Sequence, residues 1–172
     1  MVDAQPGIFA QGTRAHYHLE FDLLDGTSDE DVSAAVTRLR EPAVTVGGFN
    51  LVVGFGPTLW ERLSPGAAPA DFHAFQPIEG LDGKQVPATQ HDLWVWVHGT
   101  GPDLALDAAR AATSILGGVG SLAIEQPGFV YRDSRDLTGF IDGTERSAIF
   151  LWTFRRVSTG FVDLGAFRSG TR

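Results

Sequence analysis

The sequence contains no cysteine, which excludes disulfides, thiolate metal ligands and cysteine nucleophiles together. It has no run of about 18 apolar residues that could span a membrane, and its first residues lack the charged and apolar regions of a secretory signal. Positive charge is scarce, since 13 basic side chains face 21 acidic ones and the formal net charge is −8. We therefore expect no nucleic-acid partner, no membrane partner and a cytoplasmic location.

What is present suits one folded domain, because 172 residues with 43% hydrophobic content are enough for a sizeable core. Apolar and polar residues alternate over 16–23, which predicts a first strand with one buried face. Ser28 is a good helix N-cap before three acidic residues, and helical spacing then predicts a helix over 29–40. The apolar run 49–55 predicts a mostly buried second strand, and 57–63 predicts a short helical turn.

The second half of the pattern repeats the first. Periodicity disappears over 64–90, where proline, glycine and alanine are dense, and this predicts a long surface excursion. A strand is expected over 93–97, then a helix over 103–116 that ends at Gly117. Residues 119–124 and 129–131 predict a fourth strand interrupted by Pro127 and Gly128. The order predicts an α+β fold: a ferredoxin-like split βαβ unit with a four-stranded antiparallel sheet and both helices on one face.

One carboxylate, Asp142, stands between two glycines at the end of this pattern. Glycine allows the backbone to come close to a ligand, and the neighbouring Phe140 and Ile141 would lower the local polarity and raise the pKa of Asp142. Such a group can handle protons. The same Asp-Gly pair is also typical of a surface turn.

The string GFIDGTE at 139–145 resembles the GxxDG signature of dye-decolorising peroxidases, and four other stretches occur in the order seen in the B-type branch of that family. These stretches are VGFGPTLW (53–60), FQPIEG (75–80), PATQHDLW (87–94) and EQPGFVY (125–131). The resemblance runs from about Arg14 to Glu145, and it implies the N-terminal half of such an enzyme.

The resemblance implies a haem b cofactor, and hydrogen peroxide and a small phenolic or dye-like reductant as reaction partners. It makes Asp142 the catalytic group that moves a proton between the peroxide oxygens. It also places four neighbours along the haem. These cofactor-binding candidates are Ile141, Gly143, Thr144 and Glu145.

The sequence departs from the family after Glu145. Complete members continue with a second ferredoxin-like half that brings the proximal histidine and a distal arginine, whereas residues 146–172 contain no histidine. They carry five arginines and one aspartate, a net charge of +4, while residues 1–145 carry −12. We interpret 1–145 as the family portion and 146–172 as a non-matching basic tail, from a truncation or frameshift. The alternative function is an inactive half-domain or a ferredoxin-like oligomerisation module, so a homo-oligomer is also open.

Two further groups have competing interpretations. His16 and His18 could be a metal pair, although solvated strand positions are favoured. Trp94 and Trp96 could relay electrons, although packing on the sheet is favoured because they alternate with aliphatic residues. A mixed-charge cluster at 132–136 is interpreted as a solvated loop that could instead orient the Asp142 loop or line a haem rim.

Overall fold

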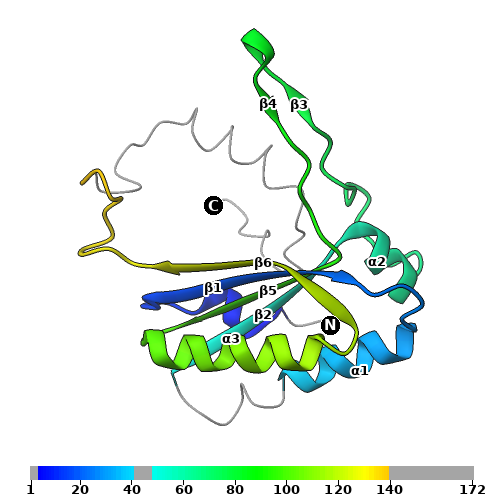
Figure 1. Ribbon diagram of the computed structural model, residues 1–172, viewed down its shortest axis with the longest axis horizontal. Helices are drawn as coiled ribbons and strands as arrows, with labels where there is room; N and C mark the ends of the chain where they lie inside the picture. The colour runs from blue at the N-terminus through cyan, green and yellow to red at the C-terminus, as the bar shows by residue number, and fades with distance from the viewer. Residues whose placement is uncertain (1–3, 41–47, 140–172) are drawn as a thin grey trace, which may run out of the picture.

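Four long strands form one sheet in a computed structural model that describes residues 4–40 and 48–139. The strand order is β2-β5-β1-β6 and every neighbouring pair is antiparallel, as the sequence predicted. Helices α1 and α3 lie side by side on one face of this sheet (Figure 1). The elements in chain order are η1 (Pro6–Phe9), β1 (Ala15–Leu23), α1 (Asp29–Arg40), β2 (Phe49–Phe55), α2 (Pro57–Leu63), β3 (Ile78–Glu79), η3 (Leu81–Gly83), β4 (Gln85–Val86), β5 (Leu93–Gly99), α3 (Pro102–Leu116) and β6 (Gly120–Phe129).

The core lies between the sheet and these two helices. Alternate residues of the two central strands point into it, since Leu19 and Phe21 of β1 and Val95 of β5 are fully buried. Small alanines on α3, including Ala109, let that helix approach the sheet closely. This is the ferredoxin-like α+β arrangement that the sequence predicted, with one face of the sheet covered by helices.

Helix α1 begins where the sequence predicted it. The Ser28 Oγ accepts a hydrogen bond from the backbone N–H of Asp31 at 3.1 Å and donates one to the Asp31 carboxylate at 2.6 Å. Three acidic residues follow in the first turn, where the helix dipole favours negative charge. Capping of this kind satisfies a backbone donor that would otherwise lack a partner.

The last strand corrects the prediction that Pro127 and Gly128 interrupt it. Strand β6 runs without a break through both residues, and Pro127 lies opposite Tyr17 of β1 in the ladder. A proline is tolerated here because β6 is an edge strand, where a missing N–H breaks no ladder bond on the outer side. The irregularity lies nearer the start of β6, where Ala123 is an extra residue between the partners of Glu20 and Phe21.

The excursion predicted over 64–90 is confirmed, and it contains a short hairpin that the sequence did not reveal. Strands β3 and β4 pair over two residues each and project away from the body (Figure 1). The side chains there are exposed, including 86% of Leu81 at the tip. Among the residues that the structure describes, no helix has the length and apolar character needed to cross a membrane.

The other edge of the sheet is closed by a side chain. The Gln5 amide donates to the carbonyl oxygen of Val53 at 2.7 Å and accepts from its N–H at 2.9 Å. Gln5 therefore satisfies both outward-facing backbone groups of one β2 residue, as a neighbouring strand would.

Candidate active site

The predicted catalytic group Asp142 lies outside the described residues, as do the four predicted haem neighbours. The structure describes the segment that leads to them, which leaves the end of β6 and ends at Gly139. Those five site residues therefore stay predictions, and so does the interpretation of 146–172 as a basic tail.

The segment that precedes the Asp142 loop is an ordered turn. Arg135 forms two hydrogen bonds with the Asp133 carboxylate, at 2.7 and 3.1 Å, and donates a third to the carbonyl oxygen of Gly139 at 3.0 Å. Arg14 at the start of β1 donates to the carbonyl oxygens of Val130 and Arg132. The cluster is exposed, as predicted, and it also fixes the first residue of the GFIDGTE string.

The face of the sheet opposite the helices carries a layer of stacked rings, here called the ring layer and made of His16, His18, Trp94, Trp96 and His98. It is built by strand register, because His16 lies opposite His98 and His18 lies opposite Trp96 across β1 and β5. Neighbouring rings are nearly parallel, with interplanar angles from 8° to 21°. The closest pair is Trp96 and His98, whose centroids are 3.9 Å apart.

His98 is the most enclosed member of this layer. It is fully buried, and neither ring nitrogen makes a hydrogen bond of good geometry among the described residues, although the nearby Gly7 backbone partly opposes the lowering of its pKa by burial. Burial lowers the pKa of His98, as it does the pKa values of His16 and His18, because a buried imidazolium loses its hydration. The three imidazoles are also close enough to oppose each other's protonation. The layer is therefore neutral near pH 7.

A second histidine environment lies at the end of β1. His91 Nδ1 is 2.7 Å from the Asp22 carboxylate, and His91 Nε2 is 4.0 Å from Glu20. Burial raises the pKa of Glu20, although the nearby His91 partly opposes that change. Two carboxylates thus hold one imidazole where the excursion returns to the sheet, so its orientation is fixed.

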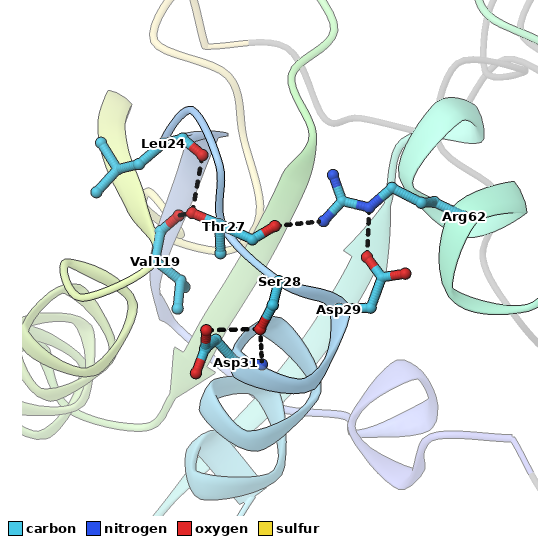
Figure 2. A network of polar contacts seen from close by, with 7 residues as sticks. All are labelled: Leu24, Thr27, Ser28, Asp29, Asp31, Arg62 and Val119. Carbon is cyan, nitrogen blue, oxygen red and sulfur yellow. Dashed lines mark hydrogen bonds and ion pairs between the residues drawn. The ribbon is translucent and has the colours of Figure 1, made fainter.

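A cavity of about 220 Å³ opens where β1 ends, against α2, and Arg62 and Asp92 contribute its charged walls. Figure 2 shows that Arg62 is already engaged, since it donates to Asp29 at 2.5 Å and to the carbonyl oxygen of Thr27 at 3.2 Å. Asp92 accepts a hydrogen bond from the N–H of Leu23. These charges hold α1, α2 and the sheet together, and neither is directed at a ligand.

A haem requires an axial ligand, and all five histidines of the sequence lie in the described residues. His16 accepts a hydrogen bond on Nδ1, His91 is held between two carboxylates, and His98 is fully buried. His73 is exposed on the excursion, and His18 is stacked against two tryptophans. The described residues also contain no cluster of three or more His, Cys, Asp or Glu side chains suited to a metal ion. They do not fit the ligand-bearing side of a haem site.

The ring layer was only partly foreseen. The sequence indicated strand positions for His16 and His18 but favoured solvated ones, whereas both side chains are half-buried between aromatic neighbours. The signal was present, because His16 and His18 repeat with the same spacing of two as Trp94, Trp96 and His98. The sequence does not show that the strand with His16 and His18 pairs with the strand that carries the tryptophans, so the spacing alone did not predict the stack.

Comparison with known proteins agrees with this fold. The family model for the N-terminal part of the Dyp-type peroxidases matches residues 5–130. The chain is 36% identical to a dye-decolorizing peroxidase of Rhodococcus erythropolis, over 77% of this chain and 40% of that protein.

Two solved structures are similar. One is a candidate Dyp-type peroxidase of Shewanella oneidensis, with a TM-score of 0.73 and 27% identity over 86% of this chain and 49% of that one. The other is a variant of Rhodococcus jostii DypB in complex with heme, with a TM-score of 0.69 and 31% identity over 83% of this chain and 48% of that one. The chain thus spans less than half the length of these relatives. It belongs to the dye-decolorising peroxidase family and corresponds to the N-terminal portion of its members.

Proposed function

We propose that this chain supplies the distal half of a haem peroxidase that uses hydrogen peroxide to oxidise phenolic or dye-like reductants. The observation that carries the proposal is family membership over residues 5–130, together with the GFIDGTE string that begins at Gly139. The haem-bound structure of the similar DypB supports haem b as the cofactor. That cofactor would supply the redox chemistry, while the chain would supply proton transfer.

In this proposal Asp142 accepts a proton from one oxygen of hydrogen peroxide and returns it to the other. Such a group works best when its pKa lies near the working pH. Phe140 and Ile141 would raise the pKa of Asp142 toward that range by excluding water. Gly143, Thr144 and Glu145 would continue along the cofactor. The ordered turn that Arg135 forms with Asp133 and Gly139 supports this, because it fixes the start of the loop.

The axial ligand is the point on which the proposal depends. Since the five histidines of the chain do not suit that role, the ligand would come from a second segment or polypeptide that corresponds to the other half of the relatives. Haem titration followed by Soret and pyridine-haemochrome spectra tests this directly. A histidine-type five-coordinate spectrum from the chain alone would contradict the need for a second half.

Asp142→Asn tests the proton-transfer role. The substitution keeps size and hydrogen bonding but removes the exchangeable carboxyl proton, so peroxide consumption should slow by about 10²-fold, the usual range for losing a general base. The measurement is stopped-flow mixing with peroxide at matched haem loading, with the complementary half present if haem binding requires it. Asp107→Asn is the matched control, because Asp107 is an exposed residue of α3 on the helix-covered side of the sheet, and its rate should equal that of the wild type. Equal rates of peroxide consumption for both variants would mean that Asp142 transfers no proton and only shapes a turn.

A second candidate function rests on the same finding about the histidines. The chain could be a non-catalytic ferredoxin-like module that pairs through its open sheet face with another copy, since large apolar surfaces rarely stay exposed on a monomer. One exposed apolar side chain of β6 favours this, since Ile124 lies opposite Glu20 on the face that carries the ring layer. Analytical ultracentrifugation separates the two functions, because this module would dimerise without haem and leave peroxide unchanged.

A further inference from the structure

Trp96 and His16 form a hydrogen-bonded donor and acceptor pair within the ring layer. The indole N–H of Trp96 donates to Nδ1 of His16 at 3.2 Å, across the pairing of β5 with β1. The two rings lie 13° from parallel with centroids 6.0 Å apart. Both side chains are half-buried, so the pair is shielded from bulk water but is not sealed off.

We propose that Trp96 is a one-electron redox residue of this protein and that His16 is its proton acceptor. The proposal rests on the proposed peroxidase function for its natural oxidant, a peroxide-activated haem. It goes beyond that function because it assigns a site for holding an oxidising equivalent on the N-terminal half. The chemistry follows from the acidity of an oxidised indole, which is far greater than that of the neutral ring.

Electrons and protons balance in two steps. In the first, Trp96 gives one electron to the oxidant and its N–H proton passes to His16 Nδ1, which leaves a neutral tryptophan radical beside an imidazolium. In the second, a phenolic reductant gives one electron to the radical and releases its own proton to solvent. The His16 proton then returns to the indole nitrogen. The oxidant is reduced by one electron and the phenol is oxidised by one.

His16 is suited to this role by its protonation state and its surroundings. Burial lowers its pKa, so the ring is neutral and can take a proton near pH 7, while a backbone hydrogen bond with Thr13 would stabilise the imidazolium once formed. The titratable groups on the same face of β1 and β5 are His18, Glu20, Asp22 and His98. The β6 residues opposite His16 and His18 are the uncharged Gly128 and Gln126.

The stack around Trp96 gives a path for the electron. Trp94 lies 6.1 Å away by ring centroids and His18 lies between the two indoles, at 5.7 Å from Trp94 and 6.0 Å from Trp96. Nearly parallel rings at these separations allow an electron vacancy to move between the two tryptophans. The vacancy would settle on Trp96, because His16 accepts the indole proton of that residue.

Trp60 provides an internal comparison. Its indole N–H is buried and has no hydrogen-bond acceptor among the described residues, and its ring is tilted 53° from that of Phe55. An oxidised Trp60 would therefore keep its proton and return to the ground state by taking back the electron. Trp96 and Trp60 thus differ in whether a proton acceptor faces the indole N–H, and this acceptor is what would make Trp96 a redox residue.

The test is flash photo-oxidation of the chain without haem, using photogenerated tris(bipyridine)ruthenium(III) as the one-electron oxidant. Transient absorption distinguishes the tryptophan radical cation from the neutral radical. The wild type should form the neutral radical with a slower rate in D₂O, and Trp96→Phe should lose this signal. In His16→Gln, the amide oxygen can still accept a hydrogen bond but is too weak a base to take the proton. Deprotonation of the Trp96 radical cation should therefore slow by about 10²-fold.

Trp60→Phe is the matched control and should keep the wild-type signal. Circular dichroism of each variant confirms that the sheet is intact. The proposal is overturned if Trp96→Phe keeps the neutral radical, or if His16→Gln deprotonates at the wild-type rate. Since the experiment uses no haem, failure of haem binding would leave its outcome unaffected and would count only against the proposed function.

Discussion

The two faces of the sheet carry different kinds of side chain. The face toward α1 and α3 is mainly aliphatic and phenyl, with Leu19, Phe21 and Val95 fully buried at its centre and Tyr17 partly buried beside them. The opposite face carries three imidazoles and two indoles in the ring layer. Strand alternation places both sets on the same two strands, one residue apart. The difference indicates that one face provides stability and the other is available for chemistry or association.

The largest expected effect tests the first half of this comparison. Phe21→Ala should lower the free energy of unfolding by about 3–5 kcal/mol, because it removes a fully buried ring and leaves a cavity beneath the helices. Trp96→Phe on the other face should cost less, because Trp96 is only half-buried and phenylalanine keeps an aromatic ring at that position. Urea denaturation of both variants gives the two values, and equal losses would break the comparison.

An effect of opposite sign is expected on the open face. His98→Leu should raise the free energy of unfolding by about 1–3 kcal/mol, because it removes a buried polar ring whose nitrogens make no hydrogen bond of good geometry among the described residues. His18→Leu, at a half-buried position, serves as the control and should gain less. A loss of stability in His98→Leu would mean that His98 has a partner beyond the described residues.

The same variant should change the pH dependence of stability. The folded pKa values of His16, His18 and His98 lie below the ordinary 6.5, so the unfolded chain binds more protons and stability falls as pH drops below 6.5. Glu20 acts in the opposite direction, because its raised pKa lowers stability as pH rises above 4.5. His98→Leu should therefore flatten the loss between pH 7 and pH 5, and an unchanged slope would contradict the lowered pKa of His98.

The smallest effect concerns how α2 is attached to the start of α1. Arg62→Gln removes the ion pair with Asp29 and should cost only about 0.2–1 kcal/mol, because both side chains are about half-exposed. The loss should shrink in high salt, which screens exposed charges. A cost comparable to that of Phe21→Ala would show that polar contacts, rather than aliphatic packing, hold the covered face.

The fold could be predicted from the sequence because its signals are local. The alternation of β1, the Ser28 cap and the helical spacing of α1 and α3 each depend on neighbours within a few residues. Two features could not be foreseen in this way. Pro127 was taken as an interruption because a single sequence does not reveal which strand lies at an edge. The ring layer needed the register of β1 against β5, which joins residues about eighty positions apart.

Asp142 shows a different limit. Its proton-handling role is a prediction from the residue type, its glycine neighbours and the family resemblance, and Asp142 itself lies outside the described residues. Each of the five histidines was a possible haem ligand by residue type. The structure argues against them through their surroundings, which are a hydrogen bond, a carboxylate pair or full burial, and spacing in the sequence alone does not reveal these.

The bidentate contact of Gln5 with Val53 has a consequence for assembly. Exposed strand edges are templates on which other chains add strands, and this is a common route to domain swapping and fibrils. Gln5 occupies the backbone groups of Val53 at one edge, and Pro127 offers no N–H at the other. A sheet terminated at both ends resists lengthening by a further strand, so molecules that join this one would meet its flat surface or its projecting hairpin.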